Sequence, residues 1–202
     1  MEPFTTVAGT AASLPAANID TDVIMPKQFL KGIDRSGLDR GAFHDLRFGA
    51  SGAQIPGFIL NRAPWRTTRF LIVGPNFGCG SSREHAVWGL AQLGIRALIG
   101  TSFAGIFFDN CARNGLLAIM AKEQDVAVLM QRASDPERNW LEIDLAQQVI
   151  VAKDGLTVHF DIEPARKEAL MQGLDAVGTT LRYRDEIEKF ERSHLGENPW
   201  LA

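Results

Sequence analysis

The hydrophobic pattern between residues 69 and 120 alternates between short apolar runs and segments with helical periodicity. Short apolar runs bounded by polar residues or glycine are typical of buried strands, and apolar residues every three or four positions are typical of helices. The pattern predicts strands at Phe70–Val73, Ala97–Ile99 and Leu116–Met120, with helices at Arg83–Leu93 and Phe103–Arg113 between them. Gly94 and Gly115 lie where helix C-terminal caps belong. This order predicts neighbouring parallel strands joined by right-handed crossovers, with a ligand site beyond the carboxyl ends of the strands.

The two flanks of this core have weaker patterns. Upstream, short strands are predicted at Phe4–Ala12, Ile19–Met25 and Gly57–Asn61, and the Gly-, Ser-, Asp- and Arg-rich stretch Lys31–Gly57 is predicted to be a loop. A connection of that length suggests a lid or binding loop. Downstream, the pattern predicts a hairpin of Trp140–Leu145 and Gln148–Ala152, a strand at Leu156–Phe160, a helix at Glu163–Gln172 and one or two helical pieces within Asp175–Arg192. The predicted fold class is α/β, with a parallel strand core and β-rich flanks.

Composition narrows the class of protein. The 202 residues are 46% hydrophobic and 22% charged, which fits one globular domain, here residues 1–202 with a helical C-terminal extension from about 175 to 202. A net charge of −3 argues against nucleic-acid binding through a broad basic surface. No run is long enough to cross a membrane, and Met1–Pro26 lacks the charged start of a signal peptide. A cytoplasmic location is the simplest interpretation.

The cysteine count limits cofactor chemistry. Cys79 and Cys111 are the only cysteines, which excludes a disulfide framework and a four-thiolate site, so the chain cannot hold an iron–sulfur cluster by itself. The number of cysteines alone does not exclude a single disulfide between Cys79 and Cys111.

The strongest candidate site is the segment 78–86, Gly-Cys-Gly-Ser-Ser-Arg-Glu-His-Ala, which leads into the predicted helix at Arg83–Leu93. The first turn of a helix carries free N–H groups and partial positive charge, so it attracts anions. Arg83 can grip a carboxylate with two hydrogen bonds, and Ser81 and Ser82 can donate to an anion or cap the helix. Ser81 would act as a base only in a strongly stabilising electrostatic environment. In isolation, a capped turn is the simpler interpretation, and the P-loop, dinucleotide and nucleophile-elbow patterns do not match.

Other reactive side chains near this turn have plainer interpretations. Cys79 could be a reactive thiol at a helix start, but a small side chain filling a tight turn is favoured. His85 could carry protons, although bracing the turn is favoured. His44, His159 and His194 are scattered without metal-ligand spacing, so no metal site is predicted.

A second candidate motif is the segment 18–26, Asn-Ile-Asp-Thr-Asp-Val-Ile-Met-Pro. Clustered Asx and Thr residues are typical of turns whose side chains bond their own backbone. Alternatively, Thr21 and Asp22 line the same site as the 78–86 turn. This segment alone leaves both interpretations open.

Together the two motifs resemble the mobile, cluster-free swivelling domain of the aconitase superfamily, specifically the small subunits of 3-isopropylmalate dehydratase (isopropylmalate isomerase). The likeness continues through residues 26–31, 101–107, Asn110 and 114–117, and so covers most of the chain. The resemblance implies a swivelling β/β/α domain like the mobile C-terminal domain of aconitase. It also implies that this chain binds no cofactor and pairs, as a heterodimer or larger assembly, with a large subunit that carries a [4Fe–4S] cluster.

The resemblance further implies a hydro-lyase that is active only with that large subunit. Its reaction would be the reversible dehydration and hydration that interconverts 2-isopropylmalate and 3-isopropylmalate through isopropylmaleate in leucine biosynthesis. The alternatives are the small subunit of a homoaconitase or of a methylmalate (citraconate) hydro-lyase, or a non-catalytic anion-binding module.

Residue roles follow from the same resemblance. Ser81 would be the alkoxide that removes a proton from the carbon next to a carboxylate, and Arg83 would hold the substrate carboxylate. Ser82 would supply hydrogen bonds, while Thr21 and Asp22 would line the opposite side of the site.

The loop after Pro26 adds three expected contacts to the small hydroxy-dicarboxylate substrate. By the same resemblance, Lys31 would be a further carboxylate contact. Adjacency to the Asp-Thr-Asp motif suggests that Phe29 and Leu30 form an apolar surface for an isopropyl group.

Overall fold

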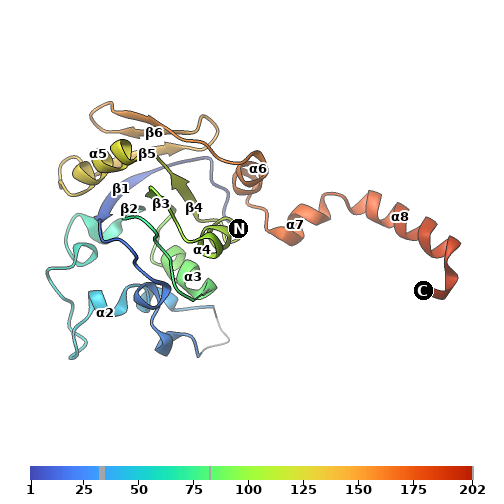
Figure 1. Ribbon diagram of the computed structural model, residues 1–202, viewed down its shortest axis with the longest axis horizontal. Coiled ribbons are helices and arrows are strands. Elements are labelled where there is room, and N and C mark those ends of the chain that lie inside the picture. The colour runs from blue at the N-terminus through green and yellow to red at the C-terminus, as the bar shows by residue number, and fades with distance from the viewer. Residues whose placement is uncertain (32–34, 82, 202) are drawn as a thin grey trace.

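A computed structural model of the chain describes residues 1–31, 35–81 and 83–201. In this part of the chain, seven strands form one mixed sheet in the order β4-β3-β2-β1-β5-β6-β7 (Figure 1). The strands are β1 Thr6–Leu14, β2 Phe70–Val73, β3 Ala97–Gly100, β4 Leu117–Met120, β5 Trp140–Asp144, β6 Val149–Ala152 and β7 Thr157–His159. Strands β1 to β4 run parallel, and β5 to β7 form an antiparallel meander attached to β1.

Strand β1 joins these two parts of the sheet. Its first half pairs with β5, from Thr6 opposite Asp144 to Thr10 opposite Trp140. Its second half pairs with β2 from Ala11 onward. One continuous strand therefore serves both a parallel and an antiparallel neighbour.

Helices cover the sheet and connect its strands. They are α1 Thr21–Ile24, α2 His44–Arg47, α3 Glu84–Gln92, α4 Gly105–Arg113, α5 Glu123–Ala133, α6 Pro164–Gln172, α7 Ala176–Leu181 and α8 Arg184–Glu197. Short 3-10 turns are η1 Lys27–Phe29, η2 Leu38–Arg40, η3 Ile59–Asn61, η4 Trp65–Thr67 and η5 Pro199–Leu201. No helix in the described ranges is long and apolar enough to cross a membrane.

Alternation along the parallel strands divides the interior into two cores. Leu71 and Val73 of β2 face a core that contains the buried residues of α3 and α4. Phe70 and Ile72 of the same strand face a core shared with α5, α6 and β5 to β7. Because successive strand residues point to opposite faces, an all-apolar run such as Phe70–Val73 is stable only when both faces are covered. Figure 1 shows α3 and α5 on opposite sides of the sheet.

The predicted α/β fold class and its central strand–helix–strand–helix–strand core are confirmed. Gly94 and Gly115 follow α3 and α4 in left-handed conformations, as expected for residues that end helices. The downstream hairpin, the strand β7 and the helix α6 are also where the pattern predicted them.

Of the three strands predicted in the upstream flank, only Phe4–Ala12 is confirmed, since it overlaps β1. Ile19–Met25 is not a strand, because the Asp20 carboxylate accepts a hydrogen bond from the Val23 N–H at 2.7 Å and starts helix α1. Gly57–Asn61 is not a strand either, since its last three residues form η3. The upstream flank therefore contributes β1 alone to the sheet among the described residues, and is not β-rich.

The stretch Lys31–Gly57, predicted as a loop, contains η2, α2 and a β-bridge between Phe48 and Gln54. Residues 32–34 lie outside the described part of the chain. The Asn61 amide donates to the Arg47 and Ile55 carbonyls at 2.7 and 2.9 Å, which ties this stretch to η3. Helix α5 was not predicted at all.

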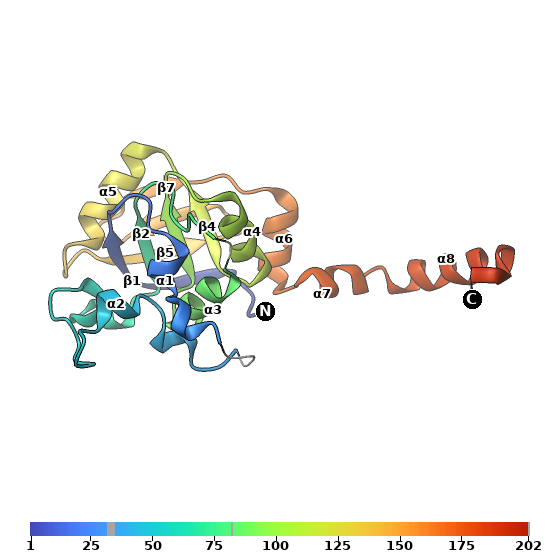
Figure 2. The ribbon, with the colours of Figure 1, turned by 60° about the horizontal axis from the view of Figure 1, so that its bottom comes forward.

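The C-terminal helices α7 and α8 extend away from the rest of the molecule (Figures 1 and 2). Helix α6 packs on the body through the buried Leu170, and no residue of α7 or α8 is buried. The helices α7 and α8 and the turn η5 together are called the arm.

Close packing beneath α1 makes a prediction about stability. The buried Met25 side chain fits against two glycines: a Cβ on Gly41 would lie 2.5 Å from its Sδ, and a Cβ on Gly89 would overlap its Cε. The Cβ on Gly89 would also lie 3.1 Å from the Leu38 carbonyl oxygen. Gly89→Ala should lower the free energy of unfolding by about 1–3 kcal/mol, because overpacking outweighs the better helix propensity of alanine.

The matched control is Gly196→Ala in α8, where a Cβ would meet nothing within 4 Å. Urea unfolding should show no loss of stability for this variant. Equal stability of Gly89→Ala and the unmodified chain would contradict the packing argument.

Candidate active site

The 78–86 turn follows β2 at the carboxyl end of the parallel strands and meets the start of α1. A parallel β-bridge joins Asp20 to Cys79. The Thr21 N–H donates to the Cys79 carbonyl at 2.9 Å, and the Gly78 N–H donates to the Ile19 carbonyl at 2.8 Å. The two motifs, about sixty residues apart in the sequence, therefore form one backbone unit.

Glycine is required at position 78. Gly78 has φ +77°, a left-handed conformation, and a Cβ there would overlap the Phe107 ring. Gly80 also has a positive φ, +84°. The turn can therefore lie against Phe107 of α4 only because position 78 lacks a side chain.

Thr21 holds the turn through a second bond. Its side chain is buried, and its hydroxyl donates to the Ser81 carbonyl at 2.5 Å. Ser81 itself is exposed, and its hydroxyl makes no hydrogen bond within the described part of the chain. The backbone of Ser81 is therefore fixed while its hydroxyl is available. Ser82, predicted as a substrate contact, lies outside the described residues.

Asp22 and Arg83 form an ion pair beside this turn. The Arg83 Nε lies 2.5 Å from the Asp22 Oδ1, with side chains 17% and 43% exposed. The angles between these two groups are not those of a hydrogen bond. Asp22 Oδ1 and Arg83 Nε therefore have no hydrogen-bond partner among the described residues. Lys27, which the sequence analysis did not single out, adds a longer contact of 3.9 Å to Asp22. Arg83 is thus partly buried and held through one nitrogen.

The first turn of α3 is held by the side chain of Asn114, the residue that follows α4. Asn114 donates to the Glu84 carboxylate at 2.8 Å and accepts a hydrogen bond from the Trp88 indole at 2.8 Å. The His85 ring packs on Trp88 of the same helix with ring centroids 4.7 Å apart, so its role in bracing the turn stays a prediction. Sequence reasoning assigned no bracing role to Asn114 or Trp88, because neither is a charged or nucleophilic group.

Phe29, Leu30 and Lys31, the loop residues expected to contact the substrate, follow the 18–26 motif in the sequence. Phe29 is partly buried and its ring lies 4.8 Å from the ring of His44, while Leu30 packs against the same core and Lys31 is exposed. No described hydrogen bond, ion pair or ring contact joins these residues to Ser81 or Arg83. The contacts of the described residues therefore join Thr21 to Ser81 and Asp22 to Arg83, and the three loop residues stay a prediction.

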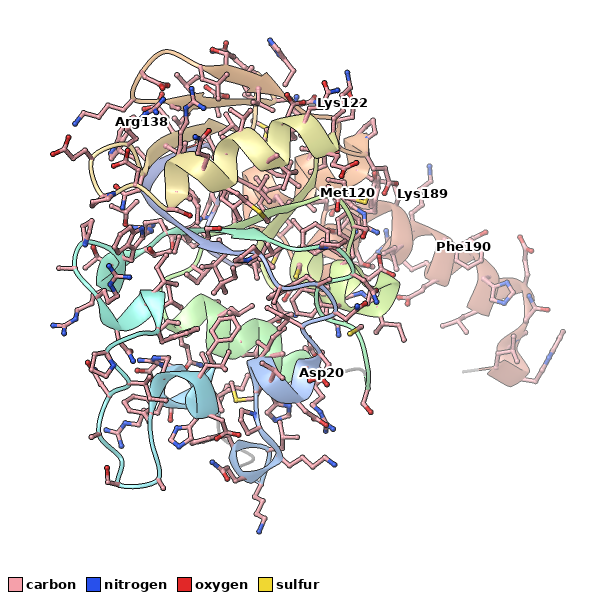
Figure 3. All side chains as sticks on the ribbon, turned by 60° about the vertical axis from the view of Figure 1, so that its left-hand side comes forward. Asp20, Met120, Lys122, Arg138, Lys189 and Phe190 are labelled. Carbon is pink, nitrogen blue, oxygen red and sulfur yellow. The ribbon has the colours of Figure 1, made fainter. Side chains whose placement is uncertain are left out.

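The candidate site is an open surface. Cavities of about 490 and 550 Å³ lie elsewhere, the first between α4, α6 and α7 and the second between α5 and the end of β2. Neither is lined by Asp22, Ser81 or Arg83. Figure 3 shows Asp20, at the start of α1, on the side of the body away from Lys122 and Arg138. A substrate bound at Ser81 would need a second surface to enclose it.

The cysteines do not form a metal site in the described ranges. Both are free, so the disulfide that counting left open is absent. Burial raises the pKa of the Cys111 thiol well above its ordinary value, which keeps it protonated in the core. No group of three or more His, Cys, Asp or Glu side chains that could hold a metal ion occurs among the described residues.

Comparisons with known proteins identify the family of the chain. Residues 1–124 match the family of aconitase C-terminal domains, residues 127–164 match the family LeuD_N, and residues 177–202 match the C-terminal domain of the 3-isopropylmalate dehydratase small subunit. A relative from Mannheimia succiniciproducens named 3-isopropylmalate dehydratase small subunit 1 is 58% identical over 100% of this chain and 99% of its own length. The chain belongs to the family of 3-isopropylmalate dehydratase small subunits.

Other members of the 3-isopropylmalate dehydratase small-subunit family are also similar over their full length. Small subunit 2 from Salmonella typhimurium is 52% identical over 100% of this chain and 96% of the relative. A crystal structure of 3-isopropylmalate dehydratase from Methanocaldococcus jannaschii has a TM-score of 0.66 and 26% identity, covering 92% of this chain and 99% of that one. The family resemblance inferred from the two motifs is confirmed.

The Thr21 contact yields a prediction that is independent of activity. Thr21→Val should lower the free energy of unfolding by about 0.5–1.5 kcal/mol, because the Ser81 carbonyl loses its donor while the volume of the side chain is kept. It should also speed amide exchange at Thr21 and Gly78, whose N–H groups bond across the bridge.

A control is Thr6→Val, since the Thr6 hydroxyl makes an exposed hydrogen bond of 3.3 Å to Asp144. Its unfolding free energy should change by less than about 0.5 kcal/mol. Unchanged exchange in Thr21→Val would show that this hydroxyl does not hold the turn.

Proposed function

We propose that this chain is the small subunit of a 3-isopropylmalate dehydratase. With a large subunit that carries a [4Fe–4S] cluster, it interconverts 2-isopropylmalate and 3-isopropylmalate through isopropylmaleate in leucine biosynthesis. The observation that carries the proposal is the joining of the 18–26 and 78–86 motifs by the bonds of Thr21 to Cys79 and Ser81. Relatives named as this subunit at 46% to 58% identity over the whole chain support the substrate class over a homoaconitase or a methylmalate hydro-lyase.

Ser81 is the proposed base. In the dehydration direction its alkoxide takes the proton from the carbon next to a carboxylate, hydroxide leaves the neighbouring carbon, and the double bond of isopropylmaleate forms between them. In the hydration step the addition has the opposite orientation: hydroxide adds to the carbon that lost the proton, and Ser81 gives its proton to the carbon that lost the hydroxide, which restores the alkoxide. Preoriented donors and nearby positive charge favour the alkoxide and the developing carbanion. The exposed Ser81 hydroxyl on a fixed backbone suits this role.

Arg83 is the proposed carboxylate clamp. Asp22 contacts its Nε, and the two terminal nitrogens have no partner among the described residues. A guanidinium can bind a carboxylate through those two nitrogens while a second anion holds Nε. Asp22 then acts as the group that orients Arg83 at the edge of the site. Ser82 and Lys31 are proposed as further polar contacts to the substrate.

The cluster belongs to the partner in this proposal. The two cysteines here do not fit an iron–sulfur cluster, because Cys111 is buried in the core and too few thiolates are present. In the large subunit, the cluster would act as a Lewis acid toward the substrate hydroxyl and carboxylate. Two free thiols also fit a reducing compartment, and we place the protein in the cytoplasm. Residues 1–202 are proposed as one swivelling domain with a helical extension from about residue 175.

The direct test is turnover of the complex reconstituted with the large subunit. Ser81→Ala should lower kcat for hydration of isopropylmaleate by about 10²–10⁴-fold, the usual contribution of a positioned acid–base group. Binding of the two subunits and the visible spectrum of the cluster should not change. Ser134→Ala, which removes an exposed hydroxyl bonded to the Met130 carbonyl at the end of α5, is the control and should be fully active.

Two results would count against the proposal in different ways. Full activity of Ser81→Ala would end the assignment of the base. An inactive unmodified complex with intact cluster would favour a non-catalytic anion-binding module.

Phe29 provides a test of specificity. If its ring forms an apolar surface for the isopropyl group, Phe29→Ala should change the ratio of kcat/KM between 3-isopropylmalate and a methyl-substituted malate by about tenfold or more. Phe48→Ala, at an aromatic residue that also contacts His44, is the control for lost packing. An unchanged ratio in Phe29→Ala would remove this residue from the substrate site.

A further inference from the structure

The arm presents large apolar side chains to solvent. Phe190 and Trp200 are 65% and 75% exposed, and Val177 and Leu181 are more than half exposed as well. Figure 2 shows α7 and α8 running outward from the body, and Figure 3 shows Phe190 clear of it. Exposed apolar side chains that gather in a patch mark interaction sites in soluble proteins, whereas singly scattered ones do not.

Two large apolar side chains of α8, Ile187 and Phe190, share one face with Tyr183 and His194. Tyr183, Ile187, Phe190 and His194 follow one another at intervals of four, three and four residues, which places them along one side of a helix. The Phe190 and His194 rings stack with centroids 5.2 Å apart. These four residues are called the arm stripe.

The charged side chains of α8 that form ion pairs lie on a different face of the helix from the arm stripe. Arg184 and Arg192 both pair with Glu188, at 2.8 and 3.7 Å, on the face away from the arm stripe. Glu186 and Glu191 lie at its two edges, because at 100° per residue each falls just outside the positions of the stripe. Neither carboxylate has a cationic partner in the described part of the chain. The arm stripe is therefore rimmed by unpaired negative charge.

We propose that the arm stripe docks in an apolar groove rimmed by Lys and Arg on the large subunit. This inference rests on the proposed function for the identity of the partner. A second copy of this chain is a poor occupant, because its arm would bring the same glutamate rim against Glu186 and Glu191, and like charges at an interface oppose association. An apolar strip with a charged rim has the anatomy of a stable protein interface.

The comparisons support a role that is particular to this family. The arm coincides with residues 177–202, which match a C-terminal domain named for the 3-isopropylmalate dehydratase small subunit. The arm begins after α6, whereas Ser81 lies at the ends of the parallel strands. Docking through the arm therefore holds the two subunits together without using the surface that must close over substrate.

The test measures the Kd between the full-length chain and the purified large subunit by biolayer interferometry. Phe190→Ser should raise Kd about tenfold or more, as expected for loss of a central aromatic anchor. Asp185→Ser, on the opposite face of α8, should stay within about twofold. Glu186→Lys together with Glu191→Lys should weaken binding comparably, and more strongly at low salt. Amide exchange across residues 184–197 should slow in the complex.

The outcomes separate this inference from the proposed function. Wild-type Kd for Phe190→Ser, with circular dichroism showing an intact helix, overturns the docking role of the arm even if the complex is active. A shift of the free chain from dimer to monomer in Phe190→Ser, without change in large-subunit binding, assigns the stripe to a second copy instead and overturns the proposal. An inactive complex whose assembly still depends on Phe190 refutes the proposed reaction and leaves the docking role standing.

Discussion

The whole candidate site depends on how Thr21 is bonded to the turn after β2. Its N–H reaches the Cys79 carbonyl and its hydroxyl reaches the Ser81 carbonyl, so a four-residue helix and a glycine-rich turn act as one rigid piece. A helix as short as α1 has almost no stability of its own, since nucleation fixes several dihedral angles for few hydrogen bonds. Tertiary contacts supply the rest: the Asp20 cap, the buried Met25 and the bridge to Cys79. The same contacts hold Asp22 beside Arg83.

In the proposed function, the surface around Ser81 and Arg83 is half of an active site. Ser81 is exposed, Arg83 is held through one nitrogen, and the large cavities lie elsewhere. Electrostatic stabilisation of an alkoxide is weak in water and grows as water is excluded. An open surface of this kind therefore has little power to ionise a serine until a second surface covers it. In the proposed function, that second surface belongs to the large subunit.

The local hydrophobic pattern of the sequence was sufficient to predict the central core. It was insufficient to predict the elements that depend on tertiary contacts. The runs at Phe70–Val73 and Ala97–Gly100 are buried on both faces, and glycines follow both connecting helices, so each element carries its own signal. Helix α5 also carried one, since Val126, Leu129 and Ala133 repeat at helical intervals. Ile19–Met25 was predicted as a strand, but the Asp20 side chain caps helix α1 there, and too few residues follow to show a helical period. The pairing of Asp22 with Arg83 has no local signal, because it joins residues about sixty positions apart.

The division of β1 between two neighbours has a consequence for how the chain folds. Pairing with β2 closes a loop of about 60 residues, and pairing with β5 closes one of about 130. During synthesis, the first half of β1 would leave the ribosome long before its partner exists, with backbone donors and acceptors unpaired. An unpaired strand edge of this kind can pair with other chains until the β5–β6 hairpin has been synthesised. Conditions that slow translation before residue 140 are therefore those in which aggregation competes best with folding.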